Sequence, residues 1–299
     1  MGATGGQWYP PEWPDRIRAL ARGELTPVPT RRAATVMLLR DGAEGAVEVF
    51  LLRRRASMAF AAGAYAYPGG SVDPRDGPDN GKDNGEKAGE KAAEEDGAED
   101  GAGNADGAVV AAAVRETFEE AGVLLAGPPP GGLVADVTGA DWEADRAALA
   151  GGRLPFADFL NRRGLVVRTD LLGRWARWIT PEFEARRYDT HFFVAALPAG
   201  QRTRNASTEA DRTLWLRPGD AVAAYERGRL LMMPPTITTL RELAPFPTVA
   251  EALAAARDRD LAPIMAQARV EGREVVLSWP GYEEFEKRVT AVDKRERTI

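Results

Sequence analysis

Hydrophobic and polar positions alternate along the chain in patterns that predict strands and amphipathic helices. Apolar runs bounded by turn residues predict strands at 33–40, 47–53, 123–125, 171–179, 190–197, 213–216 and 274–279. Apolar residues spaced three or four apart predict helices at 13–22, 108–121, 156–163, 221–227, 236–243, 250–257 and 283–288. Asp41-Gly42 opens a turn after the first strand, so the first two strands are expected to form a hairpin.

Two of the predicted helices carry terminal signals. Gly122 follows the helix at Ala108–Ala121, in the position where a helix commonly ends in a left-handed residue. Thr248 and Glu251 have the spacing of a capping box before the helix at 250–257. Both signals support the helix boundaries that the periodicity gives.

The order of the predicted elements divides the chain into three parts. Residues 1–30 form an arm that contains Trp and Pro, residues 31–218 form the main domain, and residues 219–299 form a mainly helical C-terminal extension packed on it. The length of 299 residues is compatible with one large domain or two small ones.

A low-complexity insert at 73–107 interrupts the main domain. It lacks aromatic residues, Ile, Leu and Val, so it cannot bury enough apolar surface to offset its ordering entropy. We expect a disordered acidic loop; a charged helix around Glu86–Glu95 is the alternative. Asp73–Asp106 carries a net charge of −8 and the rest of the chain +2. The chain therefore lacks the large basic surface of a nucleic-acid-binding protein.

The composition narrows the chemistry of any metal site. The chain has no Cys and one His, which excludes disulfides, thiolate sites and His-rich zinc sites. Oxygen ligands and a hard cation such as Mg²⁺ remain. No apolar stretch approaches the roughly 18–20 residues of a membrane helix, residues 1–22 lack the apolar run of a secretory signal, and the C-terminus differs from the peroxisomal Ser-Lys-Leu signal. We expect a cytoplasmic protein.

Acidic residues gather on one side of the helix at Ala108–Ala121. At about 100° per residue, Glu116, Glu119 and Glu120 fall within an arc of roughly 100°, opposite the apolar positions. Arg115 lies one turn before Glu119, where an ion pair can form. A solvated helix face tolerates three such carboxylates, but a cation such as Mg²⁺ neutralises them better.

The segment Arg115–Val123 (RETFEEAGV) resembles the right half of the Nudix box, G-x5-E-x7-R-E-U-x-E-E-x-G-U, where U is a bulky apolar residue. Thr117 replaces the first U. The left half resembles Gly70-x5-Asp76, with Asp in place of Glu. The spacer between Asp76 and Arg115 is 38 residues, about 31 more than the pattern. The chain is thus similar to Nudix hydrolases with a wide insert inside the box.

Further segments narrow the resemblance to the coenzyme A and acyl-CoA diphosphatase branch, which also carries a long insert inside the box. They are Phe60–Gly70 (FAAGAYAYPGG), Glu116–Leu125 (ETFEEAGVLL), Arg186–Phe193 (RRYDTHFF) and Pro234-Pro235-Thr236. The resemblance covers roughly residues 33–244. It implies an α/β fold: an α/β/α sandwich around a mixed β-sheet, with the box as loop–helix–loop.

The resemblance also implies roles for individual residues. Mg²⁺ or Mn²⁺ would be held by Glu116, Glu119 and Glu120 and by the main-chain carbonyl of Gly70. Arg115 would orient a carboxylate by ion pairing. Glu209, six residues before Trp215, is the candidate for an additional ligand or base; a plain loop acid is the alternative.

Phosphate binding requires cationic residues, and Arg53, Arg186 and Arg187 are the candidates. A solvated strand end is the alternative for Arg53. A structural role is expected for His191, the single histidine of the chain. Trp175 and Trp178 would either line the core or stack on an adenine.

We predict metal-dependent hydrolysis of a diphosphate bond in a small-molecule substrate, CoA or acyl-CoA, by water attack at phosphorus. Cleavage of nucleotide sugars, NADH or dinucleoside polyphosphates is the alternative. A Nudix-fold ligand sensor without catalysis is a third hypothesis, and the complete acidic cluster argues against it. No nucleic-acid or membrane partner is expected, and the sequence leaves a homodimer open.

Overall fold

The computed structural model describes residues 8–42, 45–57, 61–76, 98–272, 274–279 and 287–291. The helices are α1 (Trp13–Ala21), α2 (Ala98–Ala121), α3 (Ala140–Ala150), α4 (Phe156–Arg163), α5 (Pro218–Glu226), α6 (Pro234–Leu243) and α7 (Val249–Ala255), with short 3-10 helices η1 (Pro74–Asp76), η2 (Thr169–Leu171) and η3 (Ala256–Asp258). The strands are β1 (Trp8–Tyr9), β2 (Thr30–Asp41), β3 (Val47–Arg54), β4 (Tyr65–Ala66), β5 (Gly69–Ser71), β6 (Ala126–Gly127), β7 (Val166–Val167), β8 (Gly173–Ile179), β9 (Arg187–Ala196), β10 (Ala210–Leu216), β11 (Ile264–Met265), β12 (Gln267–Glu271), β13 (Glu274–Ser278) and β14 (Lys287–Ala291).

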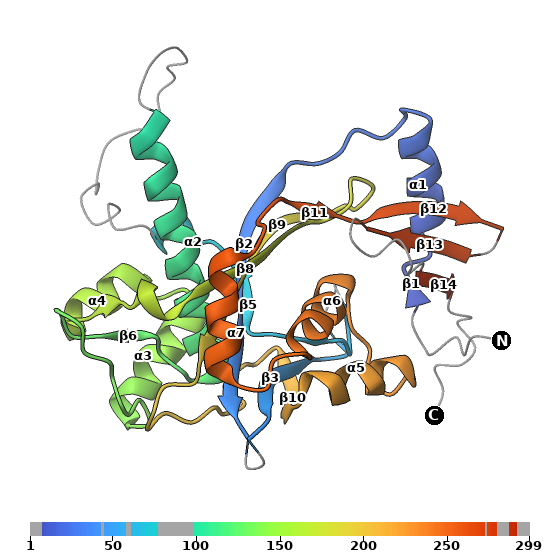
Figure 1. The fold of residues 1–299 in the computed structure, drawn as a ribbon. Coiled ribbons are helices and arrows are strands. Elements are labelled where there is room, and N and C mark those ends of the chain that lie inside the picture. Colours follow the sequence, from blue (N-terminus) through green and yellow to red (C-terminus); the bar gives the residue numbers. More distant parts are fainter. Residues whose placement is uncertain are drawn as a thin grey trace, which may run out of the picture.

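A mixed sheet forms the centre of the molecule (Figure 1). Its described strands follow the order β10-β3-β2-β9-β8-β11, and β4 and β5 pair with β3 and β2. The predicted hairpin of β2 and β3 is confirmed by antiparallel pairing, whereas β2 and β9 run parallel. The short strand β5 thereby places the Gly69-Gly70 segment directly beside β2.

Helices cover both faces of this sheet, because successive side chains of a strand point to opposite faces. On β2, Ala34 and Val36 join a buried cluster with α2, α3 and α4. Met37 and Leu39 join the cluster that contains residues of α1, α5, α6 and α7. Two apolar cores on opposite sides of one mixed sheet make the α/β/α sandwich that the sequence predicted.

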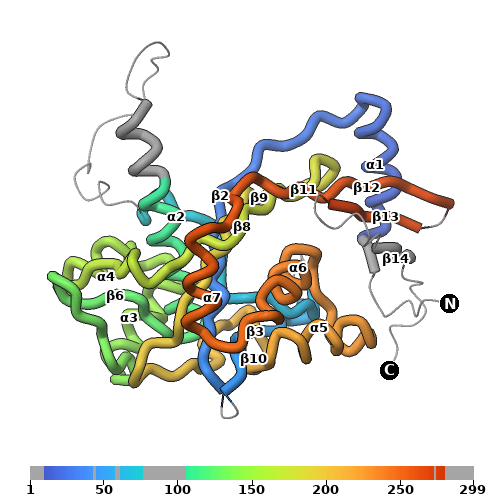
Figure 2. Tube along the Cα trace, viewed as in Figure 1, coloured from blue at the N-terminus to red at the C-terminus, as the bar shows by residue number. Residues whose placement is uncertain are grey.

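A second, smaller sheet joins the two ends of the described chain. Its order is β1-β14-β13-β12, and β1 pairs in parallel with β14. Figures 1 and 2 show the N-terminal α1 beside β12 and β13, although more than 240 residues separate them in sequence. The segment predicted as a mainly helical extension is therefore helical as far as Asp258 and continues in strands.

Most other predicted elements are confirmed, and the differences have physical causes. The strand predicted at 123–125 is absent, because the side-chain amide of Gln201 bonds both main-chain groups of Leu124, at 2.8 and 2.9 Å. Helix α3 was not predicted. The helix predicted at 283–288 is wrong for residues 287 and 288, which begin β14; residues 283–286 lie outside the described part.

The proposed insert at 73–107 is structured where it is described. Its first residues form η1, and α2 begins at Ala98, ten residues before the predicted start. The expectations for residues 77–97, including the alternative helix, lie outside the described residues. Helix α2 ends as predicted, since Gly122 has φ +67°.

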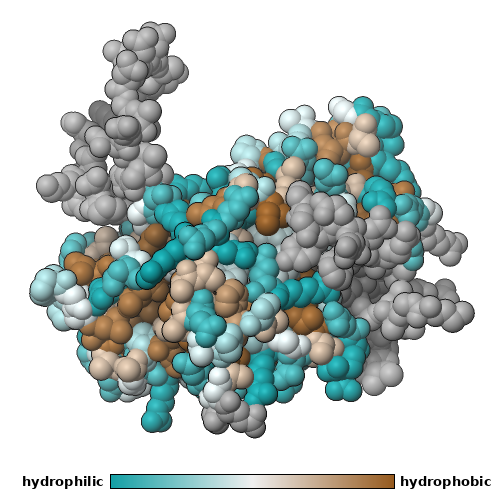
Figure 3. All heavy atoms as spheres, in the orientation of Figure 1, coloured by the Kyte–Doolittle hydropathy of each residue, from teal (hydrophilic) through white to brown (hydrophobic). Residues whose placement is uncertain are grey.

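Hydrophilic and hydrophobic residues are interspersed on the face of the molecule shown in Figure 3. Among the described helices, none combines the length and the hydropathy that crossing a lipid bilayer requires.

A carboxyl group is partly buried where α1 meets the loop between β8 and β9. Trp13 packs edge-on against Phe183 at 5.1 Å, and Arg16 donates to the Phe183 carbonyl at 2.5 Å. Burial raises the pKa of the adjacent Glu184 from 4.5 to about 7, although Arg16 opposes the shift. The stabilisation linked to this group is present below pH 4.5 and is lost as the pH rises through 7.

Glu184→Gln should therefore raise the melting temperature at pH 8, where the wild-type carboxylate is charged, and give no gain at pH 4.5. Thermal unfolding of both proteins at the two pH values measures this difference. An equal shift at both pH values would show that the charge of Glu184 is not its cause.

Candidate active site

Helix α2 turns its acidic residues toward β5 and η1 because its other side is firmly packed in the core. Phe118 is fully buried and stacks on Phe159 of α4 at 5.5 Å. Thr117, in an apolar position of the box, is also fully buried and donates its hydroxyl to the Ala113 carbonyl at 2.7 Å. This hydrogen bond satisfies a polar group that would otherwise be costly in the core. The rotation of the helix is thereby fixed.

Arg115 lies at the centre of the carboxylates. Its guanidinium bonds Asp76 at 2.8 and 3.1 Å, Glu116 at 2.8 Å and Glu119 at 3.1 Å. It also donates to the Ser71 carbonyl at 2.9 Å. The Asp76 side chain is 1% exposed. The structure thus brings the left half of the box to the right half across the 38-residue spacer.

The Gly69-Gly70 loop lies against the other carboxylates. The Pro68 carbonyl accepts from the Val36 amide at 3.0 Å and from the Thr35 hydroxyl at 2.6 Å, which attaches the loop to β2. The Gly69 amide donates to Glu120 at 2.9 Å. A Cβ on Gly69 would come within 2.5 Å of the Ala34 carbonyl oxygen, so glycine is required there by the close approach of two backbone segments. A Cβ on Gly70 would come within 2.4 Å of the Glu116 carboxylate, so any other residue at this position would displace that carboxylate.

Burial and mutual repulsion make the charged carboxylates unfavourable. Burial raises the pKa of Glu116 to about 7 and that of Glu120 to about 8, and the Glu116 charge contributes to the shift of Glu120. Burial also raises the pKa of Glu119. An additional positive charge nearby would stabilise the ionised form of these carboxyl groups.

A divalent cation would supply such a charge, and the donor set fits one in part. Within the described residues, no three acidic or histidine side chains form a ready-made coordination group. Mg²⁺ typically takes one or two protein carboxylates and completes its shell with waters and substrate phosphates. The neighbouring carboxylates of Glu116 and Glu120 correspond to that smaller set.

Glu209 reaches the same region from the loop before β10. Its main-chain carbonyl accepts from the Arg55 amide at 2.8 Å, and its half-exposed carboxylate lies 3.9 Å from Arg54. The Arg54 charge also lowers the pKa of Glu120, against the larger effect of burial. The ends of β3 and β10 thereby place one cation and one acid next to α2.

A cavity of about 280 Å³ adjoins these groups. One wall is charged and contains Arg115, Glu116, Glu119 and Glu209. Another part of the wall comes from the end of α3 and the start of α4 and includes the apolar residues Leu149, Leu154, Pro155 and Phe156. The cavity therefore offers polar and apolar contacts side by side.

Two of the three arginines selected from the sequence have other contacts. Arg53 pairs with Asp211 at 2.7 Å, and Arg187 donates to the carbonyls of Thr180 at 3.1 Å and Val28 at 3.0 Å. Arg186 is exposed. None of the three lines the cavity at Glu116, so their phosphate-binding roles stay predictions.

The other side chains weighed from the sequence lie in the sheet. Trp175 and Trp178 are buried in the core, with exposures of 0% and 3%. His191 is partly buried on β9, and burial lowers its pKa. Its neighbour Asp189 forms a two-point ion pair with Arg177 at 2.8 and 2.6 Å.

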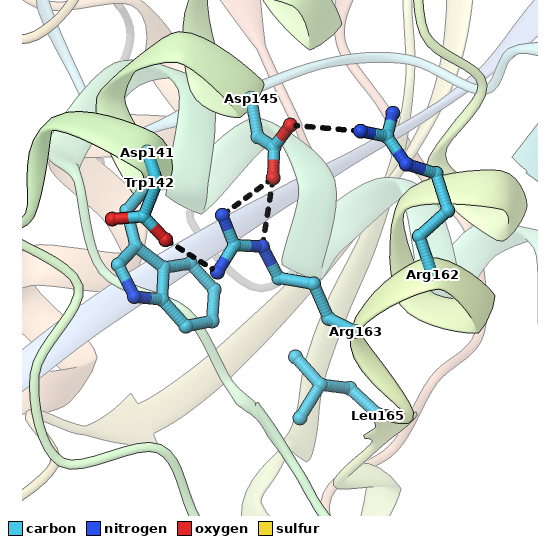
Figure 4. Close-up of a pocket in the computed structure, with 6 residues that line it drawn as sticks. All are labelled: Asp141, Trp142, Asp145, Arg162, Arg163 and Leu165. Atoms are coloured by element: carbon cyan, nitrogen blue, oxygen red, sulfur yellow. Dashed lines mark hydrogen bonds and ion pairs between the residues drawn. The ribbon is translucent and has the colours of Figure 1, made fainter.

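A second pocket of about 410 Å³ lies between α3 and α4 (Figure 4). Arg163 stacks over Trp142 at 3.7 Å and pairs with Asp141 at 3.0 Å and Asp145 at 2.6 Å. The charged residues that line this pocket are thus paired with one another. This pairing favours a structural role for the pocket residues, which join α3 to α4.

The fold and the carboxylate-bearing helix together define a Nudix domain. A solved structure of a Nudix hydrolase from Alicyclobacillus acidocaldarius is 29% identical and matches with a TM-score of 0.62 over 76% of this chain and 96% of that one. The family model described as the NUDT19 Nudix domain matches residues 84–243, more than half of the chain. The chain belongs to this family.

Curated relatives match about half of this chain. The acyl-coenzyme A diphosphatase NUDT19 of Gallus gallus is 29% identical over 165 residues, which cover 50% of this chain and 44% of that protein. The Homo sapiens protein of the same name is 32% identical over 161 residues, covering 49% and 41%. The matched part thus spans less than half the length of these relatives.

Three residues of the site were given no role of their own from the sequence. Asp76 was named only as the end of the left half of the box. Arg54 lies beside the candidate Arg53, and the sequence does not separate the two, since both end the same strand. Arg146, 8% exposed on α3, donates to the Glu119 carbonyl at 2.7 Å, and no sequence signal indicated it.

Asp76→Asn should lower the free energy of unfolding by about 2–4 kcal/mol, because a buried arginine loses part of its charge compensation. Urea denaturation measures the loss. The matched control is Asp211→Asn, which breaks the exposed pair with Arg53 and should cost less than about 1 kcal/mol. Equal effects of the two substitutions would contradict the central role of the Asp76–Arg115 pair.

Proposed function

We propose that this chain is a Nudix hydrolase that cleaves the diphosphate bond of CoA or an acyl-CoA. The observation that carries the proposal is the buried pair of carboxylates, Glu116 and Glu120, held against a glycine loop beside a cavity with a further acid. Burying mutually repelling acids is unfavourable in a purely structural role. The arrangement is suited to a cation that binds a diphosphate.

In this proposal Glu116 and Glu120 hold Mg²⁺ or Mn²⁺, with Glu119 and the Gly70 carbonyl as further candidate ligands. When bound, the cation would neutralise charge on the diphosphate oxygens. Arg115 keeps Glu116 and Glu119 in place through its ion pairs. The Gly69 amide does the same for Glu120. The carboxylates are thus pre-positioned before substrate arrives.

Glu209 is proposed as the general base. Its carboxylate lines the cavity and is half exposed, so water reaches it. It would accept a proton as a water oxygen attacks phosphorus, and the bond from that phosphorus to the bridging oxygen would break. The Glu209 carboxylate lies 3.9 Å from the Arg54 guanidinium, which is longer than a hydrogen bond.

The choice of substrate is supported by the relatives named acyl-coenzyme A diphosphatase and by the two walls of the cavity. CoA carries a phosphorylated nucleotide on one side of its diphosphate and a pantetheine chain on the other. The apolar residues at 149–156 suit the pantetheine chain. The charged wall is mainly acidic, so it would accept the diphosphate only together with the cation. The expected products are 3′,5′-ADP and a 4′-phosphopantetheine compound.

A substrate panel tests the proposal. CoA, an acyl-CoA, 3′-dephospho-CoA, NADH, a nucleotide sugar and a dinucleoside polyphosphate are incubated with Mg²⁺ or Mn²⁺, and products are identified by mass spectrometry. CoA or its ester should be cut, and Glu120→Gln should lower kcat by about two to three orders of magnitude. Efficient cleavage of a nucleotide sugar or NADH alone would refute the choice of substrate. Absence of any cleavage would favour a ligand sensor.

Arg54 is proposed to bind a substrate phosphate, because its charge reaches the carboxylate region. Arg54→Ala should raise KM by about tenfold, as expected for the loss of one charge-assisted hydrogen bond of roughly 1.5 kcal/mol. The adjacent Arg53 pairs with Asp211, so Arg53→Ala is the matched control and should change KM less than about twofold. Steady-state kinetics at saturating Mg²⁺ compare the KM values of the two variants. A larger rise in KM for Arg53→Ala than for Arg54→Ala would show that Arg53, and not Arg54, binds the phosphate.

A further inference from the structure

The C-terminal end of α2 is satisfied by groups from outside the helix. The last four carbonyl groups of a helix have no partner within it. Here all four accept hydrogen bonds. Phe118 accepts the helix's own last bond, from the amide of Gly122 at 3.0 Å. The other three accept from outside the helix: Glu119 from the Arg146 side chain at 2.7 Å, Glu120 from the amide of Ala206 at 3.3 Å, and Ala121 from the amide of Arg204 at 3.0 Å; the Ala206 amide also donates to the Arg204 carbonyl at 3.0 Å. Residues 204–206 thus dock by their main chain onto the helix that carries the acidic cluster.

The docked segment continues directly into the site. The Ser207 hydroxyl lies 3.5 Å from the Glu120 carboxylate and accepts from the Glu209 amide at 3.0 Å. Only one residue separates Ser207 from Glu209, so a shift of the segment relative to α2 would move the proposed base.

Arg146 joins the segment to the helix. One of its nitrogens donates to two carbonyl groups, that of Glu119 at 2.7 Å and that of Ala206 at 3.0 Å. The other nitrogens bond the carboxylate of Glu143 at 2.5–3.1 Å. Glu143 also accepts from Arg204 at 2.8 Å. One buried guanidinium therefore links helix α3, the end of α2 and the segment that leads to Glu209.

Helix α3 is itself fixed in place. On its other side, Arg163 of α4 stacks over Trp142 and pairs with Asp141 and Asp145 (Figure 4). The Arg146 backbone is thus anchored by contacts that do not involve the site. A positive charge beside the C-terminal end of α2 is also favourable for the helix dipole.

We propose that Arg146 is a positioning residue, which sets the location of Glu209 relative to the carboxylates of α2. This rests on the proposed function, in which Glu209 acts on the attacking water. Arginine suits the role because its planar fork reaches two carbonyl groups and a carboxylate together, whereas the compact ammonium of lysine does not span them. Arg146 does not line the described cavity, so it acts on catalysis through the groups that it holds, which are the segment at 204–206 and the end of α2 that carries Glu119.

Arg146→Met tests the proposal, because it keeps an unbranched apolar stem and removes every donor. Hydrogen exchange at the amides of Arg204 and Ala206 should become at least about tenfold faster, while exchange in the middle of α2 stays unchanged. In the same protein kcat should fall by about 30-fold with KM within about threefold, since a displacement of the order of 1 Å can cost about 10²-fold. Arg146→Lys should recover part of both effects.

The matched control is Arg162→Met, on the neighbouring helix. Its side chain is 64% exposed and lies 3.8 Å from Asp145, so neither exchange nor kcat should change. Unchanged exchange at residues 204–206 in a folded Arg146→Met protein would overturn the proposal, and so would normal kcat with accelerated exchange. If the wild type cleaves no diphosphate, the proposed function fails, and with it the catalytic role of Arg146; the exchange measurement still decides whether Arg146 holds the segment.

Discussion

The site depends on one arginine that compensates three carboxylates. Arg115 bonds Asp76, Glu116 and Glu119 within 3.1 Å, and its own side chain is 11% exposed. Without it, buried acids on one helix face would repel each other at a high desolvation cost. The same guanidinium reaches the Ser71 carbonyl, so the ion pairs also fix the loop that follows β5. The same arginine therefore both compensates the carboxylate charges and fixes the position of the loop.

This constraint explains how the box tolerates a 38-residue spacer. The entropic cost of closing a loop grows only slowly with its length, so a longer spacer changes the stability of the closed form little. What the site requires is that Asp76 and Arg115 meet. Asp76 is held on both sides, by Arg115 and by the Asp73 amide at 2.7 Å. The shorter Asp in place of Glu is accommodated by η1, which brings the carboxylate to the guanidinium.

Sequence patterns correctly predicted the features that depend on interactions between residues close together in the chain. The apolar period of α2, its terminal glycine and the β2–β3 hairpin were all predicted, because each depends on neighbours in sequence. Helix α3 was missed, since its 11 residues are mainly polar residues and Ala and show no clear apolar period. The choice between Arg53 and Arg54 depends on how β10 pairs with β3, and the pairing of β1 with β14 joins opposite ends of the chain. Such long-range contacts leave no signal in a short window of sequence.

The two buried arginines beside α2 hold different parts of the site. Arg115 acts on side-chain carboxylates, so its effect is electrostatic and concerns the groups proposed to bind the cation. Arg146 donates to the main-chain carbonyls of Glu119 and Ala206, so it fixes the position of the segment that leads to the proposed base. Both arginines bond residues of α2, and α2 is itself held in the core by Phe118. The packing of Phe118 therefore affects the position of the carboxylates and of the segment that leads to Glu209. Cation binding and base position can therefore be perturbed separately, although one helix carries both.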